Sequence, residues 1–303
     1  MFTARNKGRL ALGAAVVGAA LALTGCATGD PLDTGSGDEN TNSETIVVGS
    51  QAYYSNEIIA EIYAQALENA GFEVEREFQI GQRDAYLPAL ESGEVDVFPE
   101  YTGNLLQFYS PDTTATESEE VYAELADAMP EGLTVLDQAS ATDQDSYNVT
   151  ADFAAANSLV SLADLAGVSD LTLGGNAELE ERPYGPTGLQ EVYGATVGFT
   201  ATGDTTVDAL AAGTINIANV YSADPRIQTE NLVSLTDPEG LFLASNVVPL
   251  VNADIADSIA DVINAVSAKL TPEGLVALNV QSTVDKMSSD DIASAWLSEN
   301  GLG

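Results

Sequence analysis

The chain has 303 residues and carries 47 acidic residues against nine basic ones, so its formal net charge is −38 at pH 7. Repulsion from a phosphate backbone argues against nucleic acid as a partner. The chain has no histidine and a single cysteine, which excludes Ser-His-Asp and Cys-His nucleophiles and argues against a zinc site. It also lacks a glycine-rich phosphate-binding motif with its lysine, so we expect neither a metal nor a cofactor.

The amino-terminal residues are typical of an export signal rather than of folded structure. Three basic residues precede an apolar run over residues 10–23, which is followed by Leu-Thr-Gly-Cys ending at Cys26. This pattern predicts a lipoprotein signal peptide over residues 1–25 and a lipid on Cys26; the alternative is an ordinary signal peptide with a chance cysteine. Residues 26–44 are mostly small and polar, which is typical of a flexible tether. We therefore expect an extracytoplasmic protein that a lipid anchors to the cell membrane.

From residue 45 onward, apolar runs and amphipathic segments alternate, which predicts strands and helices in turn. In the first part, strands are expected over residues 46–50, 72–80, 95–98 and 133–136, and helices over residues 55–71, 83–92 and 116–129. Ser55 or Asn56 is expected to cap the first helix. Pro99 is expected to turn the chain and to leave residues 100–103 in a loop.

The same order of elements follows in the second part. Strands are expected over residues 171–175, 195–200 and 215–220, and helices over residues 187–193 and 205–212. An apolar strand over 247–251 and helices over 255–269, 272–280 and 289–299 complete the chain. This alternation predicts an α/β fold with mixed sheets. Because the strand over 247–251 is expected to return to the first lobe, we assign residues 45–145 and 246–303 to lobe 1 and residues 146–245 to lobe 2.

Two segments of the sequence, residues 89–101 and residues 209–221, share one pattern of residue types. Each copy has the end of a helix, a glycine, a short apolar strand and a tyrosine just beyond it. A repeat of this kind predicts two similar lobes. Ligands of open α/β sheets bind beyond the carboxyl ends of the strands. We therefore expect Tyr101 and Tyr221 to meet at a shared cleft that closes on a small molecule.

Tyrosines and one arginine are the candidate ligand-binding residues. Tyr101, Tyr221 and Tyr147, at the expected crossover between lobes, lie in predicted turns, and an aromatic cage binds a quaternary ammonium group through cation–π attraction. For any one tyrosine, the alternative is an ordinary packing residue. Arg182 offers a planar pair of donors for a carboxylate; the alternative is a surface ion pair with a neighbouring glutamate. Tyr63 is expected in the core and Arg83 at the surface.

At these residues the chain resembles a known family: the osmoprotectant-binding lipoproteins of ABC importers, which carry glycine betaine, carnitine, choline and related quaternary amines. The most specific match is Pro-Glu-Tyr-Thr-Gly over residues 99–103. Other family-like stretches lie at residues 48–50, 62–65, 87–90, 145–147, 188–189, 193–194, 224–227 and 296–297. The resemblance covers nearly the whole domain after the tether. It implies a two-lobed, type II periplasmic-binding-protein-like fold with the ligand cleft between the lobes.

The resemblance also implies roles for particular residues. By position, the cage places are Tyr101, Tyr147 and Tyr221, the carboxylate-binding place is Arg182, and Asp145 is an acidic residue beside the cage. Neighbouring polar contributors are Gln51, Thr102, Asn104 and Asn246. Two of these depart from the family pattern, because Gln51 stands where a lysine or another polar donor is common and Asn246 stands where a further tyrosine is expected. Tyr53 or Tyr54 is a candidate for filling that gap.

We therefore predict a solute-binding protein of an ABC importer, without enzymatic activity, that acts as a monomer and delivers a quaternary amine to separate permease and ATPase subunits. One alternative is a protein of the same fold that binds another small solute, such as an amino acid or an aromatic compound, with Asp145 serving an amine. The others are an extracellular hydrolase based on two carboxylates and an adhesion lipoprotein without a small ligand.

Overall fold

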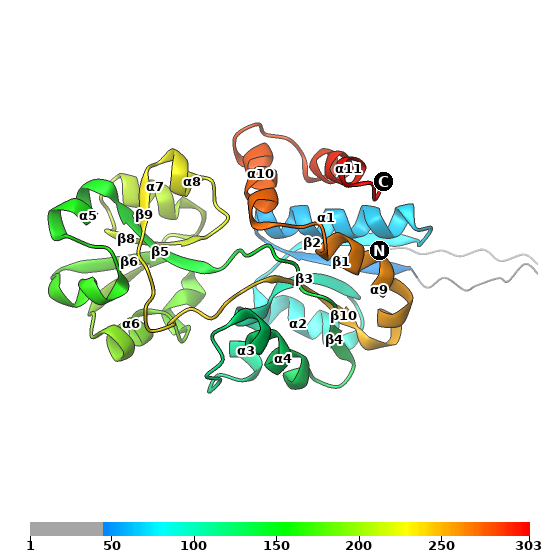
Figure 1. The fold of residues 1–303 in the computed structure, drawn as a ribbon, viewed down its shortest axis with the longest axis horizontal. Coiled ribbons are helices and arrows are strands. Elements are labelled where there is room, and N and C mark those ends of the chain that lie inside the picture. The colour runs from blue at the N-terminus through cyan, green and yellow to red at the C-terminus, as the bar shows by residue number, and fades with distance from the viewer. Residues whose placement is uncertain (1–44) are drawn as a thin grey trace, which may run out of the picture. The chain divides into compact units, whose positions relative to one another are not determined.

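Two five-stranded mixed sheets organise the structure, a computed structural model that describes residues 45–303 (Figure 1). The predicted signal peptide, the tether and Cys26 lie outside the described residues. The strand order is β2-β1-β3-β10-β4 in the first sheet and β7-β6-β8-β5-β9 in the second. We call each sheet with the helices packed on it a lobe. Between residues 45 and 303, no helix combines the length and the apolar character that a bilayer crossing requires.

The first lobe alternates strands and helices, as the sequence predicts, and its last strand comes from late in the chain. Its elements are β1 (Ile46–Gln51), α1 (Tyr54–Asn69), β2 (Val74–Gly81), α2 (Arg83–Ser92), β3 (Val97–Tyr101), α3 (Thr102–Tyr109), α4 (Ser118–Ala128), β4 (Leu133–Val135), β10 (Val247–Asn252), α9 (Ala253–Ser267), α10 (Pro272–Thr283) and α11 (Ser289–Asn300). Strand β10 pairs antiparallel with both β3 and β4. The chain therefore crosses between the sheets twice, once before β5 and once before β10.

The second lobe consists of one uninterrupted stretch of chain. Its elements are β5 (Asp145–Thr150), α5 (Ala151–Asn157), η1 (Leu162–Gly167), β6 (Leu171–Gly175), η2 (Ala177–Glu181), α6 (Pro186–Tyr193), β7 (Val197–Ala201), η3 (Gly203–Thr205), α7 (Thr206–Ala211), β8 (Ile217–Tyr221), α8 (Arg226–Thr229) and β9 (Leu232–Ser234). Strands β6, β7 and β8 run parallel, and β5 pairs antiparallel with β8 and β9.

The sequence repeat corresponds to a structural repeat. Strands β3 and β8 hold the same central place in their sheets, and a glycine with positive φ precedes each strand. An Asx side chain then accepts from the neighbouring parallel strand in both copies: the Val47 amide of β1 donates to Asp96 Oδ2 at 2.9 Å, and the Thr172 amide of β6 donates to Asn216 Oδ1 at 2.7 Å. The repeat therefore brings Tyr101 and Tyr221 to equivalent strand ends.

Helices cover both faces of the first sheet, which explains the continuous apolar run of β10. On one face, α1 packs with α9, α10 and α11 around Tyr63, which lies in the core as predicted. On the other face, α2, α3 and α4 enclose Phe98 and Leu250. A strand buried on both faces needs apolar residues at successive positions rather than at alternate ones. In the second lobe, Leu173 and Ile217 belong to the main core.

The structure corrects the prediction of a loop after Pro99. Strand β3 continues through Pro99 to Tyr101, and α3 begins directly at Thr102. Pro99 pairs with Pro249 of β10, and an antiparallel ladder contains pairs in which neither residue donates to the other. Two prolines that face each other therefore sacrifice no hydrogen bond between these strands. Figure 1 shows β3 and β10 as neighbours in the first lobe.

Candidate ligand-binding site

A cavity lined by both lobes lies where the parallel strands end. It encloses about 540 Å³ of space, part of it open to solvent. Strands β1 and β3 contribute Gln51 and Tyr101, and β8 contributes Tyr221, so the cavity has the location that the repeat predicts. Its other lining residues are Tyr53, Gln82, Arg83, Asn104, Asp143, Asp145, Asn176, Glu178, Leu179, Arg182, Tyr184 and Asn219.

Four tyrosines line this cavity, two from each lobe. Tyr53 and Tyr101 belong to the first lobe, and Tyr184 and Tyr221 belong to the second. The rings of Tyr53 and Tyr221 contact each other across the lobes, with their centroids 4.9 Å apart. Burial raises the pKa of all four phenols above the ordinary tyrosine value. The tyrosines therefore stay neutral at physiological pH and present uncharged ring faces to a ligand.

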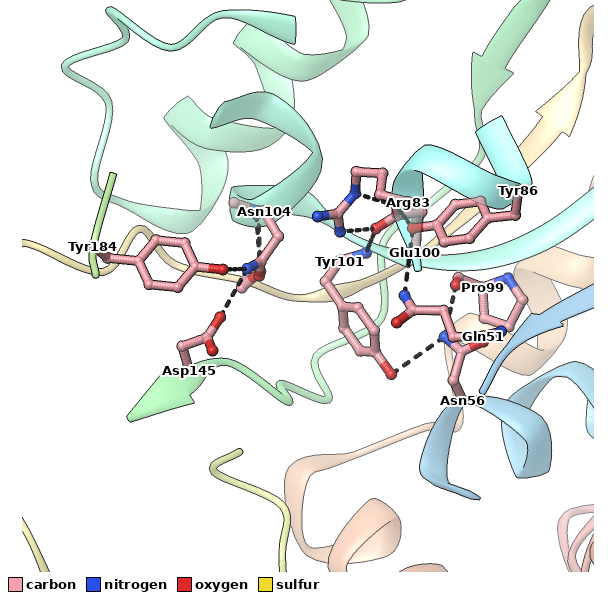
Figure 2. A network of polar contacts seen from close by, with 12 residues as sticks. Gln51, Asn56, Arg83, Tyr86, Pro99, Glu100, Tyr101, Asn104, Asp145 and Tyr184 are labelled. Atoms are coloured by element: carbon pink, nitrogen blue, oxygen red, sulfur yellow. Dashed lines mark hydrogen bonds and ion pairs between the residues drawn. The ribbon is translucent and has the colours of Figure 1, made fainter. Parts of the chain in front are cut away.

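A buried ion pair between Arg83 and Glu100 lies next to Tyr101. The prediction that Arg83 lies at the surface is therefore wrong. Arg83 Nε donates to Glu100 Oε1 at 2.7 Å and Nη2 donates to Oε2 at 2.9 Å (Figure 2). The hydroxyl of Tyr86 also donates to Glu100, and the Tyr101 amide donates to Glu100 Oε2 at 2.8 Å. Because Glu100 neutralises the guanidinium, Arg83 can be buried without an uncompensated charge.

Asn56 links this support to the rest of the first lobe instead of capping α1. The cap position is occupied by Tyr53, without a side-chain cap bond. Asn56 Nδ2 donates to the Pro99 carbonyl at 2.8 Å and to the Tyr101 hydroxyl at 3.4 Å, while its Oδ1 accepts from the Gln51 amide at 2.9 Å (Figure 2). Through these hydrogen bonds, Asn56 fixes the positions of Tyr101 and Gln51, which end β3 and β1, relative to each other.

Asn104 connects the two lobes at the cavity. Its Nδ2 donates to Asp145 Oδ2 at 2.8 Å and to the Tyr184 hydroxyl at 3.0 Å (Figure 2). Asn219 Nδ2 donates to the other oxygen of Asp145 at 3.0 Å. Both carboxylate oxygens of Asp145 thus accept hydrogen bonds from amides of the protein, and the carboxylate holds Asn104 of the first lobe against the second lobe.

Arg182 lines the cavity as a half-buried cation. Between residues 45 and 303, ion pairs form at Arg76, Arg83 and Arg226, but none forms at Arg182. The alternative of an ion pair with a neighbouring glutamate is therefore wrong within the described part of the chain. An arginine without a carboxylate partner at a cavity wall is available to bind an anionic group of a ligand.

Three predicted site residues do not reach the cavity. Tyr147 lies in the core of the second lobe with 0% of its surface exposed, packs its ring against Phe242, and donates its hydroxyl to the Tyr184 carbonyl at 2.5 Å. It lies within β5 rather than in a turn, and the overlying Phe242 separates its ring from solvent.

The other two residues, Thr102 and Asn246, bind to each other and to the chain near the crossovers. Thr102 Oγ1 accepts from the Asn246 amide at 3.0 Å, and Asn246 Nδ2 donates to the Ala139 carbonyl at 2.9 Å. These two residues brace the crossover segments.

Sequence reasoning missed several lining residues, and some of them had a visible signal. Asn219 precedes Tyr221 by two positions, so it shares the side of β8 that faces the cavity. Tyr184 follows Arg182 by two residues in the same irregular segment. Tyr53, a candidate for the missing tyrosine at Asn246, does line the cavity. Asp143 had no such signal, because its contacts with Ser55 and the Ala223 amide join residues far apart in the sequence.

Two lobes with a ligand cavity between them define a solute-binding protein of the periplasmic-binding-protein class. The chain belongs to the family of substrate-binding domains of ABC-type glycine betaine transport systems, whose model matches residues 44–299. The family and the two-lobed fold that the sequence predicts are thus confirmed. The family is one of solute-binding domains, so the main interpretation of the sequence, a solute receptor of an ABC transport system, fits as well.

Known relatives agree with this assignment. The glycine betaine-binding protein YehZ of Escherichia coli (strain K12) is 28% identical over 276 residues, which make up 84% of this chain and 90% of that protein. The structure of apo YehZ from Escherichia coli has a TM-score of 0.64 at 27% identity, and covers 86% of this chain and 100% of that one. A glycine betaine/carnitine/choline ABC transporter structure has a TM-score of 0.70 at 19% identity over 85% of this chain and 99% of that one, which supports the fold.

Proposed function

We propose that this protein is a lipid-anchored, extracytoplasmic receptor that binds a quaternary ammonium osmoprotectant, such as glycine betaine, carnitine or choline, and delivers it to an ABC permease with its ATPase. The observation that carries the proposal is the cavity wall of four neutral tyrosines, drawn from both lobes. A quaternary ammonium group has no N–H donor, so ring faces suit it better than hydrogen-bond acceptors. The anchor is Cys26, and the receptor acts as a monomer. Its lobe 1 comprises residues 45–145 and 246–303 and its lobe 2 residues 146–245, with Asp145 at the boundary as the first residue of β5.

Closure of the lobes couples binding to a change of state. Tyr101 and Tyr221 come from different lobes, so a cage that uses both rings is complete only when the lobes are close together. A ligand that bridges the lobes binds the closed state better than the open one and shifts the population toward it. Asn104 of the first lobe donates to Asp145 and Tyr184 of the second lobe, so these hydrogen bonds also require the lobes to be close together.

Thermal unfolding with a panel of solutes tests the ligand class. The panel contains glycine betaine, carnitine, choline, proline betaine, and neutral and acidic amino acids. We expect quaternary amines to raise the melting temperature of the protein, by an amount that grows with ligand concentration, because they bind only the folded state. A rise with amino acids alone would favour the alternative solute class, and no rise with any solute would contradict a small-molecule receptor.

Arg182→Ala is expected to separate ligands with a carboxylate from those without one. Loss of a charge-assisted hydrogen bond costs about 1.5–3 kcal/mol, so we expect the affinity for glycine betaine to fall by roughly 10- to 100-fold. Choline has no carboxylate and should lose little affinity. Calorimetric titration measures both, and Lys269→Ala at an exposed position is the charge-matched control. An equal loss for the two ligands would contradict a carboxylate role for Arg182.

A further inference from the structure

Asp143 is a buried carboxylate at the cavity with one oxygen left unpaired. It lies in the crossover between β4 and β5, is 3% exposed and lines the cavity. Its Oδ1 accepts from the Ala223 amide at 3.1 Å, whereas its Oδ2 is buried and has no hydrogen-bond partner among residues 45–303. The nearby Asp145 differs in this respect, because amides of Asn104 and Asn219 bind both of its oxygens.

The surroundings of Asp143 contain few groups that could neutralise it. The titratable and charged groups that face it are Tyr53 and Tyr54 at the start of α1, Tyr101 on β3, Asp145 on β5, Tyr221 on β8, and Asp224 in the segment after β8. Burial raises the pKa of every one of these tyrosines, so they stay uncharged. Asp224 pairs with Arg226 at 2.6 Å, so that arginine is already engaged.

An unpaired buried carboxylate favours the protonated form. The pKa of Asp143 is raised to about 7, chiefly by burial and to a smaller extent by the negative charges of Asp224 and Asp145. The Ala223 amide and the nearby Ser55 hydroxyl oppose the rise, although the Ser55 hydroxyl forms no hydrogen bond of normal geometry. A positive charge in the cavity would favour the ionised form instead. Without a ligand, Asp143 has no positive charge as its partner in the described part of the cavity, and a cationic ligand would supply one.

We propose that Asp143 is a specificity-determining residue that recognises the positive charge of the bound head group from the crossover side of the cavity. This inference rests on the proposed function, since it assigns a role toward the cation that the tyrosines enclose. A quaternary ammonium cannot donate a hydrogen bond to Oδ2, so the attraction acts through space between the carboxylate and the fixed charge. The tyrosine rings hold the head group, and Asp143 favours a charged head group over an uncharged one of the same shape.

The proposal makes binding depend on pH with a definite sign. Below about pH 7 the free protein carries a proton on Asp143, which must be lost before the carboxylate can attract a cation. Affinity for a cation is therefore full above this pH and falls as the pH decreases, by up to about tenfold per pH unit. Choline and glycine betaine keep their charges across this range, so the change belongs to the protein. Binding near pH 7 should also release protons.

Calorimetric titration of the purified protein with choline and glycine betaine, from about pH 8.5 to about pH 5.5, tests this proposal. In the unsubstituted protein we expect affinity to fall about tenfold or more toward acid pH. Asp143→Asn keeps the acceptor for the Ala223 amide, and we expect it to bind about tenfold more weakly at high pH with little dependence on pH. Asp152→Asn, on α5 of the second lobe, removes one charge away from the cavity and should behave like the unsubstituted protein.

The outcomes separate this proposal from the function on which it rests. Binding that is strong and independent of pH in the unsubstituted protein would overturn the role of Asp143 and leave the receptor function intact. Absence of binding at every pH would overturn both. Should Asp143→Asn fail to fold, the pH profile and the proton release of the unsubstituted protein still decide the question. A further probe is 3,3-dimethyl-1-butanol, the uncharged isostere of choline, whose binding should not weaken toward acid pH.

Discussion

Arg83→Met is expected to lower the free energy of unfolding by about 3–5 kcal/mol, because it breaks a buried ion pair and leaves one charge without its partner. The side chain of Arg83 is 8% exposed and that of Glu100 is 0% exposed. Removing the guanidinium leaves the glutamate as a buried charge with only the Tyr86 hydroxyl and the Tyr101 amide as donors. Urea denaturation at neutral pH, followed by circular dichroism, measures the loss.

Two controls identify the cause of this loss. The double variant Arg83→Met with Glu100→Gln removes both charges, and it should recover much of the stability, because a neutral pair leaves no uncompensated buried charge. Arg76→Met removes a partly exposed arginine that pairs with the exposed Glu68 and the buried Glu61. It should cost less than Arg83→Met, because Gln65 still donates to Glu61 at 2.9 Å and Glu68 is in contact with solvent. A double variant as unstable as Arg83→Met alone would show that lost packing, rather than charge, explains the effect.

Local patterns in the sequence predicted most elements of the fold. The predicted helix over 83–92 and the predicted strand over 171–175 match α2 and β6, because glycine stops and apolar periodicity are visible within each segment. The course of the chain at Pro99 could not be predicted in this way. Its strand continues because Pro249, 150 residues later, provides a partner that requires no donor. Among the missed elements, α3, α5 and β9 are short, so their patterns are weak.

The site could be predicted where symmetry or position along a strand determined it. The repeat placed Tyr101 and Tyr221 at equivalent strand ends, and Arg182 and Gln51 also line the cavity. Arg83 was misplaced because the carboxylate that permits its burial lies 17 residues away. Tyr147 was misplaced because the ring that covers it comes from Phe242. Burial and pairing of charges depend on contacts that no local pattern contains.

Tyr101→Ala and Tyr221→Ala are each expected to weaken the binding of a quaternary amine by about 1–2 kcal/mol, the scale of a desolvated cation–π contact. Tyr101 ends β3 and Tyr221 ends β8, so each variant removes one ring from a different lobe. The loss of affinity in Tyr221→Ala should be at least as large as that in Tyr101→Ala, because the ring of Tyr221 also contacts Tyr53. Calorimetric titration with glycine betaine and with choline measures both losses.

Phenylalanine variants at the same positions separate the ring from the hydroxyl. The Tyr101 hydroxyl accepts from Asn56 at 3.4 Å and the Tyr221 hydroxyl accepts from Asn176 at 3.3 Å, both long contacts. Tyr101→Phe and Tyr221→Phe keep the aromatic faces, so they should bind within a few-fold of the unsubstituted protein if cation–π attraction dominates. A loss in the phenylalanine variants equal to that in the alanine variants would assign recognition to the hydroxyls. Unchanged affinity in both alanine variants would mean that neither ring encloses the cation.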